Sequence, residues 1–263
     1  MKRVILLTGC INPNGMPFTK LTDANERQKQ YINAIQFYIE NTDCEIVFCE
    51  NSNTDITPFF KDVQNRLEVL TFPGNQDKQR GKGYGETEII EYALLHSSYI
   101  QGACIIIKIT GRLIINNICP IIKSLKYKYD FVTCLFHSNL TFADSRIICG
   151  TTAFYKEFLN NKEYLNDSEG IFFEHVLAST VRDSSICFIP FSEKPMIIGS
   201  SGTTGELYHD VTTNKKEAIK YRYYSWIQLK KIYLHSPHRH HSLLKKICIQ
   251  LKILKYQVLS KIM

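Results

Sequence analysis

The sequence has 263 residues, a net charge of +7, 44% hydrophobic and 22% charged side chains. These values are ordinary for a globular protein of one large domain, with or without an appendage. The nine scattered cysteines include no C-x-x-C pair, which argues against a zinc site or a disulfide framework and favours reduced core thiols in a cytoplasmic protein. The first apolar run, Val4–Leu7, is too short for a signal peptide, and no stretch reaches the ~18 apolar residues of a membrane span.

The charge divides the chain into two parts. From Lys215 onward there are twelve Lys and Arg and a single acid, Glu217, whereas residues 1–214 carry 20 basic and 24 acidic side chains. We therefore predict a mildly acidic body, residues 1–210, and a strongly basic tail, residues 211–263, that binds an anionic surface.

In the first half of the chain, short apolar runs predict buried strands, and apolar residues at helical spacing predict helices. The strands are expected at residues 4–8, 45–50 and 67–72. Asp23 is placed to cap a helix, with Glu26 as its capping-box partner. The polar, glycine-rich segment 75–85 is expected as a turn before a second helix at 86–96.

The second half continues this alternation. Strands are expected at residues 104–110, 130–136, 145–149 and 185–190, and helices at 120–127, 151–158 and 170–181. The alternation predicts an α/β fold, a Rossmann-type, mostly parallel sheet flanked by helices. The run 104–110 is apolar except for Lys108, which is typical of a central strand covered on both faces. Ligands bind outside the carboxyl ends of such strands. The first candidates for a site are therefore Lys108, Thr110, Gly111 and Arg112.

Two later segments allow more than one interpretation. The Gly-, Ser- and Thr-rich segment 196–206 is either a linker or a mobile lid whose N–H and hydroxyl groups meet a phosphate. The tail contains two helical patterns separated at Ser236-Pro237, the first aromatic and basic, the second with an apolar stripe. Such a tail suits an anionic membrane surface, or it packs on the body or on a second subunit. Four histidines around the break favour a solvated loop, more cationic at lower pH, over a metal site: His235, His238, His240 and His241.

Six short motifs follow one another over residues 1–210. They are Leu7-Thr-Gly9, Phe48-Cys-Glu-Asn-Ser52, Gly81-Lys-Gly-Tyr-Gly-Glu86, Lys108-Ile-Thr-Gly-Arg112, Asp144-Ser-Arg146 and Phe172-Phe-Glu-His175. Their order and spacing resemble those of bacterial GT-A-like nucleotide-sugar glycosyltransferases from capsule, O-antigen and lipooligosaccharide loci. The resemblance implies a GT-A-like fold and sugar transfer to a cell-surface glycan or lipid-linked glycan acceptor. The basic tail would then hold the enzyme on the inner face of the cell membrane.

The resemblance also implies which residues bind the nucleotide-sugar donor. In this family the ends of the first two strands hold the base and ribose, which points to Thr8, Gly9, Glu50 and Asn51. A carboxylate such as Glu50 suits this role, because it accepts hydrogen bonds from ribose hydroxyls or a base N–H. Its alternative role is that of a capping or solvated acid at a strand end. The other donor-binding candidates are Lys82, Tyr84, Lys108, Thr110, Gly111 and Arg146.

The sequence departs from the family at the metal site. Enzymes of the GT-A type usually carry Asp-x-Asp after the central strand, whereas this chain has Thr110-Gly-Arg112 there. We therefore expect no metal cofactor, with Mg²⁺ or Mn²⁺ as the fallback, and fixed cations that stabilise the leaving diphosphate. Arg112, Lys108 and Lys82 are the candidates, although the sequence favours a solvated loop lysine as the interpretation of Lys82.

Two carboxylates are candidates for the reaction itself. Glu174 is flanked by Phe172 and Phe173, which predicts a partly desolvated general base with a raised pKa. His175 is its alternative. Asp144 is expected to accept a hydrogen bond from a sugar hydroxyl, or else to pair with Arg146 as a structural link.

Two rival functions remain open. One is a Rossmann-like protein whose basic, aromatic tail binds nucleic acid, although the acidic body argues against a nucleic-acid partner. The other is a sugar nucleotidyltransferase, a class that normally needs metal-holding carboxylates, and these are lacking at the expected turn.

Overall fold

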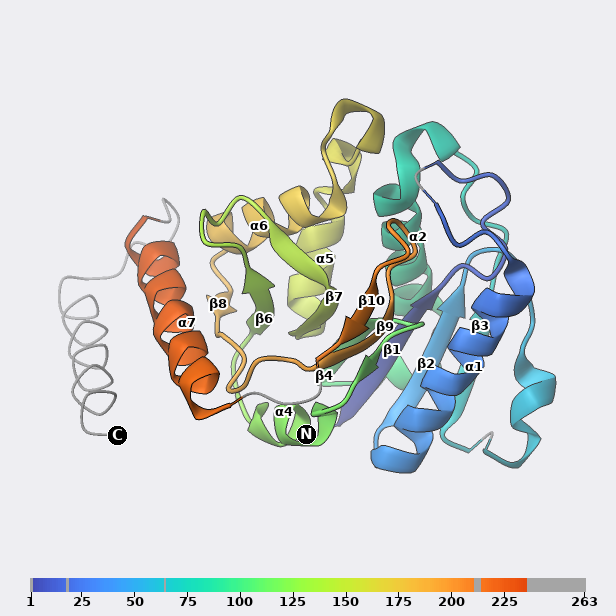
Figure 1. Cartoon of the computed structure of the whole chain (residues 1–263), viewed down its shortest axis with the longest axis horizontal. Helices are drawn as coiled ribbons and strands as arrows, with labels where there is room; N and C mark the ends of the chain where they lie inside the picture. The colour runs from blue at the N-terminus through green and yellow to red at the C-terminus, as the bar shows by residue number, and fades with distance from the viewer. Residues whose placement is uncertain (1, 18, 64, 211–213, 236–263) are drawn as a thin grey trace.

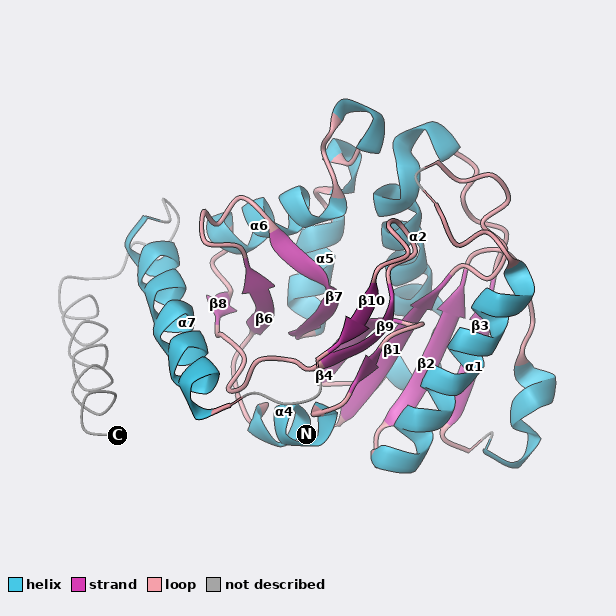
Figure 2. Cartoon of the chain, in the orientation of Figure 1, coloured by secondary structure: helices cyan, strands magenta, loops and turns pink. Residues whose placement is uncertain are grey.

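A computed structural model describes residues 2–17, 19–63, 65–210 and 214–235 of the chain. The predicted second tail helix and the histidines after Pro237 lie outside these described residues. Figures 1 and 2 show the arrangement of the described elements, with a central sheet between two layers of helices.

The body is built around a seven-stranded sheet with the order β3-β2-β1-β4-β7-β6-β8. All of its strands except β7 point in the same direction. The strands are β1 (Arg3–Gly9), β2 (Glu45–Glu50), β3 (Leu67–Thr71), β4 (Ile105–Thr110), β6 (Phe131–Phe136), β7 (Ala143–Gly150) and β8 (Cys187–Phe188). The predicted α/β fold with a mostly parallel sheet flanked by helices is confirmed.

A second, three-stranded sheet lies against the first. Its strand order is β10-β9-β5, with β5 (Ile114–Ile115), β9 (Ile197–Ser200) and β10 (Leu207–His209). The segment 196–206 is therefore no plain linker, because it supplies β9 and the connection to β10. Its apolar residues Ile197 and Ile198 pair with β5, which follows the end of β4. This hairpin brings a Gly-, Ser- and Thr-rich loop over the carboxyl edge of the main sheet.

Helices cover both faces of the main sheet (Figure 1). On one face lie α2 (Gly81–His96), α5 (Thr152–Leu159) and α6 (Phe173–Asp183); on the other lie α1 (Ala24–Asn41) and α4 (Ile118–Ser124). The short α3 (Ser98–Gln101) follows α2. Short 3₁₀ segments are η1 (Thr57–Val63), which is kinked at Phe60, η2 (Lys78–Arg80), η3 (Lys162–Tyr164) and η4 (Asp167–Glu169).

Two helix starts differ from expectation in an informative way. Asp23 caps α1 as predicted, since its Oδ1 accepts from the backbone N–H of Asn25 at 2.8 Å. Glu26 does not complete a capping box and instead accepts from Gln30 at 3.2 Å. Helix α2 begins at Gly81 rather than at residue 86, so the glycine-rich segment forms its first turns.

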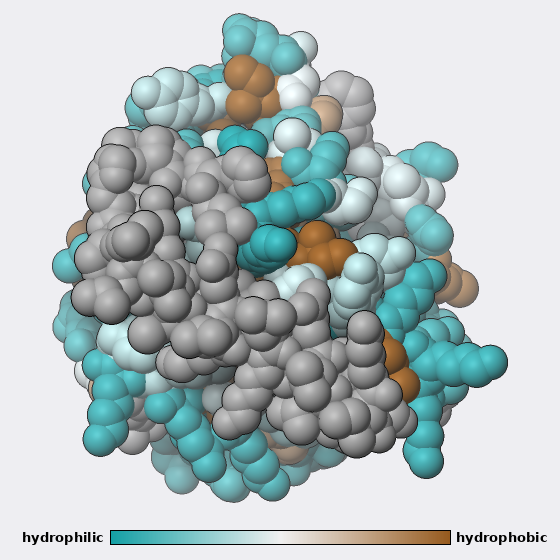
Figure 3. All heavy atoms as spheres, turned by 90° about the vertical axis from the view of Figure 1, so that its left-hand side faces the viewer, coloured by the Kyte–Doolittle hydropathy of each residue, from teal (hydrophilic) through white to brown (hydrophobic). Residues whose placement is uncertain are grey.

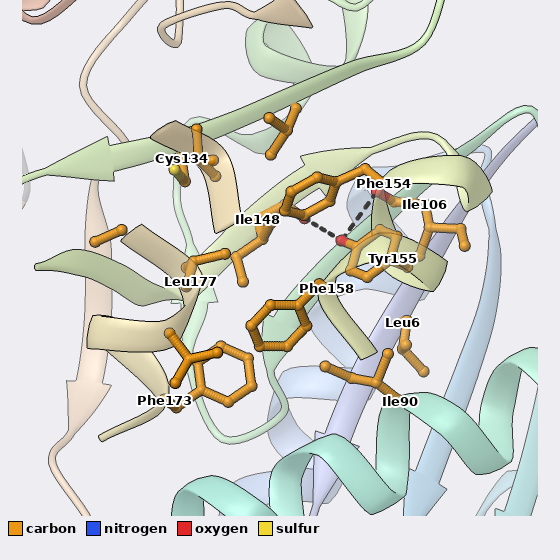
Figure 4. Close-up of a cluster of buried hydrophobic side chains, with 14 of the residues drawn as sticks. Leu6, Ile90, Ile106, Cys134, Ile148, Phe154, Tyr155, Phe158, Phe173 and Leu177 are labelled. Carbon is orange, nitrogen blue, oxygen red and sulfur yellow. Dashed lines mark hydrogen bonds between the residues drawn. The ribbon is translucent and has the colours of Figure 1, made fainter. Parts of the chain in front are cut away.

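A cluster of aromatic side chains joins α5 and α6 to the sheet (Figure 4). The buried hydroxyl of Tyr155 donates to the carbonyl of Ile148, in β7, at 2.8 Å. The rings of Phe158 and Phe173 lie 4.8 Å apart, centroid to centroid. Phe173 is the first residue of α6, so this packing fixes where that helix begins.

The first tail helix, α7 (Lys215–His235), packs along the β8 edge of the body. Ile232 is 2% exposed in the core, and Gln228 donates to the carbonyl of Phe136, in β6, at 2.8 Å. Of the described helices, none is long and apolar enough to cross a membrane. Figure 3 looks onto this side, where the described surface is mostly hydrophilic, with small separate apolar patches.

Candidate active site

A cleft of about 530 Å³ opens at the carboxyl ends of β1 and β4. Its walls are the start of α2, the start of α6 and the loop between β9 and β10. Strand β7 is antiparallel, so its beginning also lies at this edge. Eight of the predicted site residues line the cleft: Thr8, Gly9, Asn51, Lys82, Thr110, Arg112, Arg146 and Glu174.

A chain of polar contacts crosses the cleft floor. Glu86, on α2, accepts from the hydroxyl of Thr8 at 3.0 Å and forms an ion pair with Lys108. The ammonium group of Lys108 also donates to the carbonyl of Ser145 at 2.6 Å. The hydroxyl of Ser145 in turn donates to Glu174 at 2.5 Å.

Lys108 is fully buried beneath the cleft rather than exposed in it. Its charge is neutralised by Glu86, and the Phe173 ring lies 5.4 Å from its ammonium group. The predicted direct contact between Lys108 and a diphosphate is therefore wrong in this structure. Lys108 instead holds Glu86 and the start of β7 in place.

Glu174 lies in the first turn of α6, next to the anchored Phe173. Burial raises the pKa of the Glu174 carboxyl above its ordinary 4.5, while the hydrogen bond from Ser145 opposes this rise. The desolvated carboxylate expected from the flanking phenylalanines is present at the cleft wall. Such a group accepts a proton more readily than an ordinary carboxylate.

Two arginines place positive charge at the cleft. Arg112 is 9% exposed, and its guanidinium donates to the carbonyl of Ser200 at 3.1 Å and to the side-chain oxygen of Gln30 at 3.2 Å. Arg27, on α1, donates to the carbonyls of Cys10 at 2.7 Å and of Leu21 at 3.2 Å. Within the part of the chain that the structure describes, neither arginine has a carboxylate in salt-bridge range.

Lys82 adds a third cation to the same cleft. Its ammonium group donates to the hydroxyl of Thr203, in the β9–β10 loop, at 2.6 Å. Burial lowers the pKa of Lys82, and the nearby charges of Arg27 and Arg112 lower it further, although Asp167 acts in the opposite direction. The side chains of Arg27, Lys82 and Arg112 all line this cleft, so the three positive charges lie in one site.

The glycines of the α2 start pack against protein groups. A side chain at Gly81, where φ is +86°, would overlap the Asp167 carboxylate, and one at Gly85 would overlap Asn75. Asp167 accepts from the backbone N–H of Gly83 at 3.3 Å, and burial raises its pKa. These glycines thus allow close approach, as expected, but to Asp167 and Asn75. No motif marks Asp167 or Arg27 in the sequence, because their partners come from distant segments.

Glu50 is not placed to bind a ribose. It is fully buried and accepts from the backbone N–H groups of Ile11, Ser52 and Thr54 at 2.8–2.9 Å. The alternative structural role therefore describes Glu50 here, where it holds the loops after β1 and β2 together. Its neighbour Asn51 does line the cleft, donating to Asn75 at 3.0 Å.

Asp144 is engaged by Arg146. The Arg146 guanidinium donates to both oxygens of Asp144, with Nε at 2.9 and 3.0 Å. The structural link is therefore what this structure contains, and the predicted role of Asp144 as acceptor from a sugar hydroxyl lacks an open oxygen. Arg146 itself lies over the Tyr208 ring, 4.6 Å from its centroid, at the cleft wall.

Two further candidates lie outside the cleft lining. The Tyr84 ring packs under the Arg80 guanidinium, 3.9 Å from its centroid, and faces the aromatic core. Gly111 allows its backbone to approach β1, where it donates to the carbonyl of Thr8 at 2.9 Å. Both residues therefore make structural contacts in this fold. The sequence position of Tyr84 did not reveal which way its side chain points.

Of the described residues, no group of three or more His, Cys, Asp and Glu side chains is placed to hold a metal ion. Glu86 and Asp167 are the cleft carboxylates besides Glu174, and they are engaged by Lys108 and by the α2 backbone. The expectation about metal dependence stays a prediction.

No protein-family model and no curated protein sequence matches this chain. Among solved structures, a protein provisionally described as a nucleotide-diphospho-sugar transferase from Desulfovibrio desulfuricans G20 is similar with TM-score 0.46 and 11% identity, over 72% of this chain and 80% of that one. A glycosyltransferase involved in glycosylating the major capsid of PBCV-1 has TM-score 0.46 and 8% identity, over 84% and 100%. The inositol-1-phosphate CTP transferase from T. maritima has TM-score 0.45 and 12% identity, over 89% and 97%. At this distance we assign no activity from these similarities.

Proposed function

We propose that this protein is a glycosyltransferase that moves a sugar from a nucleotide-sugar donor to a glycan acceptor without a metal ion. The observation that carries the proposal is the pair of buried arginines, Arg27 and Arg112, which face one cleft and, among the residues that the structure describes, have only neutral oxygen partners. Uncompensated guanidinium groups are costly to bury unless an anion meets them. A diphosphate of the donor is the anion that the cleft position at the strand ends favours.

The neutral partners of the cations are replaceable by phosphate. Arg112 contacts the carbonyl of Ser200, at the end of β9, and Lys82 contacts the hydroxyl of Thr203, in the β9–β10 loop. Charge-assisted hydrogen bonds to phosphate are stronger than these. The loop would then close over the diphosphate as a lid, with the nucleoside toward Thr8, Gly9 and Asn51. Fixed cations there stabilise the charge that develops on the leaving nucleoside diphosphate.

Glu174 is the proposed general base. The acceptor hydroxyl gives its proton to the Glu174 carboxylate while its oxygen forms the new bond to the anomeric carbon. The bond from that carbon to the phosphate oxygen breaks, and the electron pair leaves with the nucleoside diphosphate. The raised pKa of Glu174 strengthens it as a base, and the hydrogen bond from Ser145 keeps it oriented.

The tail supplies the proposed location on the inner face of the cell membrane. The outward side of α7 carries the exposed aromatic side chains Tyr223 and Tyr224 beside Lys216 and Lys220. Aromatic and basic side chains together suit an anionic bilayer surface. A lipid-linked glycan acceptor, as in capsule or lipopolysaccharide synthesis, would be presented at such a surface.

A transfer assay over a panel of nucleotide sugars, run in EDTA, tests the proposal. We expect nucleoside diphosphate to be released from donors of one nucleotide class. We expect the rate of this release to be about 100-fold lower for Lys82→Ala. The matched control is Lys78→Ala, since Lys78 lies four residues earlier, outside the cleft lining, and donates to the carbonyl of Asn14. Release of pyrophosphate from a nucleoside triphosphate and a sugar phosphate would instead identify a nucleotidyltransferase and overturn the proposal.

A further inference from the structure

Four aromatic rings meet at one rim of the cleft, where the turn between β6 and β7 lies beside the start of α6. The ring centroids of His137 and Phe142 are 4.7 Å apart, and those of Phe142 and His175 are 5.3 Å apart in an edge-on arrangement. Phe172 stacks on His175 at 5.5 Å. We call these four side chains the aromatic rim.

The aromatic rim belongs to the same cleft as the proposed base. Phe142 and Phe172 line the cleft together with Glu174. Phe172 is 39% exposed, although it directly precedes the buried Phe173. Its backbone N–H donates to Nδ1 of His175 at 3.2 Å, which orients the His175 ring at the N-terminus of α6, and the Phe172 ring stacks on that ring. The rim therefore has a fixed position next to the reacting group.

The turn that carries Phe142 is held in an unfavourable backbone conformation. Leu140 has φ of +60° although it is a bulky residue, and its side chain is buried. Such conformations cost about 1–3 kcal/mol and persist only where the surroundings impose them. Hydrogen bonds from His137 N–H to the Phe142 carbonyl, at 2.9 Å, and from Leu140 N–H to His137 close the turn. The turn thus presents the Phe142 ring to the cleft.

We propose that the aromatic rim binds the sugar ring of the acceptor, with one C–H face of a pyranose stacked on Phe172 and Phe142. This inference rests on the proposed function. Aromatic faces carry partial negative charge and attract the partially positive C–H groups of a sugar. A pyranose stacked there directs a hydroxyl toward the adjacent Glu174.

Saturation-transfer NMR with methyl glucoside, galactoside and mannoside is the direct test, with isothermal titration of UDP, GDP and CDP in parallel. We expect one glycoside to receive saturation mainly on the C–H groups of one ring face. Phe172→Ala and Phe142→Ala are each expected to lower the affinity for this glycoside about fivefold. Phe172→Trp is expected to keep the wild-type affinity for the glycoside. The affinity for the nucleotide is expected to stay unchanged in all three variants. Phe59→Ala is the matched control, because Phe59 is 59% exposed on η1, outside the cleft lining.

The outcomes separate the two proposals. Glycoside binding that is unchanged by Phe172→Ala and Phe142→Ala would contradict acceptor binding by the aromatic rim. Wild-type protein that binds a nucleotide but no glycoside would contradict it as well. Neither result would contradict the proposed donor site. Weaker nucleotide binding in the rim variants would mean that the rings stack a base, which also overturns the acceptor assignment. Wild-type protein that binds no nucleotide contradicts the proposed function itself.

Discussion

Glu174 combines burial, a hydrogen bond from Ser145 and a place on the cleft wall. If it is the base, Glu174→Gln removes proton acceptance with little change in shape. We expect sugar transfer to fall about 100-fold, while nucleotide binding stays within about twofold of wild type. The rate of the wild-type enzyme should also fall toward low pH with an apparent pKa above 4.5, because protonated Glu174 is inactive. Full activity of the Gln variant would remove Glu174 from the mechanism.

The same variant has a signature in stability. Since burial raises the pKa of Glu174, the folded protein holds this proton more tightly than the unfolded chain does. The group therefore favours folding at low pH, and this contribution is lost as the pH rises through the raised pKa. At about pH 8, Glu174→Gln should unfold at a higher temperature than wild type, with the difference shrinking toward about pH 4. An increase in unfolding temperature that does not depend on pH would show that burial of the Glu174 charge is not the cause of the increase.

At the residue scale, the sequence predicts the edge of the sheet better than the direction of each side chain. Arg112, Lys82 and Glu174 line the cleft because they follow or begin elements whose ends meet there. Glu50 and Lys108 come from the predicted strands, but their side chains make buried structural contacts. Glu50 accepts a hydrogen bond from the loop residue Thr54, and Lys108 forms an ion pair with Glu86. The direction of each side chain depends on the alternation along its strand, and a single apolar run does not reveal which of its residues face which side of the sheet.

The start of α2 is the element whose local sequence was most misleading. Its glycines indicated a turn, whereas Gly83 and Gly85 lie in the first turns of the helix, and Asp167 and Asn75 occupy the space beside them. Helical glycines are unfavourable by propensity, so tertiary contacts decide this segment. The β9–β10 hairpin was hidden for a similar reason, because its pairing partner β5 is distant in sequence.

A pair of substitutions tests this contact between elements. Gly81 and Gly170 both have positive φ, of +86° and +77°, but only Gly81 lies against Asp167. Gly170→Ala should therefore lower the free energy of unfolding by about 1–2 kcal/mol from backbone strain alone. Gly81→Ala should lower it further, as measured by urea denaturation, because ψ of −172° places Gly81 in a region that is essentially restricted to glycine, and because the new Cβ also displaces the Asp167 carboxylate. Equal effects of the two substitutions would argue against a tight contact at Gly81.

At the scale of the whole molecule, charge and composition predicted a body and a basic tail, and the division at residue 210 stays a prediction. The first tail helix packs on the body through Ile232, which the sequence left open. Ile232→Ala should lower the free energy of unfolding by about 2–5 kcal/mol. Ile219→Ala, on the same helix but 47% exposed, should change it by less than about 0.5 kcal/mol. Denaturant titration that finds both variants equal to wild type would mean that α7 is undocked in solution.

The outward side of α7 gives a separate prediction about location. Removing two charges with Lys216→Ala and Lys220→Ala should weaken binding to vesicles with anionic lipid roughly 30-fold, at about 1 kcal/mol per lysine. The matched control is Lys61→Ala with Lys128→Ala, which removes the same charge from exposed positions of the body. Cosedimentation in which both pairs behave alike would refute a tail-specific surface.

The central claim is that Arg112 and its neighbours, rather than a bound ion, meet the diphosphate. Isothermal titration of UDP, GDP and CDP, in EDTA and in Mn²⁺, measures this directly. The account predicts one nucleotide with the same Kd in both conditions, and a Kd about tenfold or more higher for Arg112→Ala. Binding that appears only with Mn²⁺, or that is indifferent to Arg112→Ala, would contradict it.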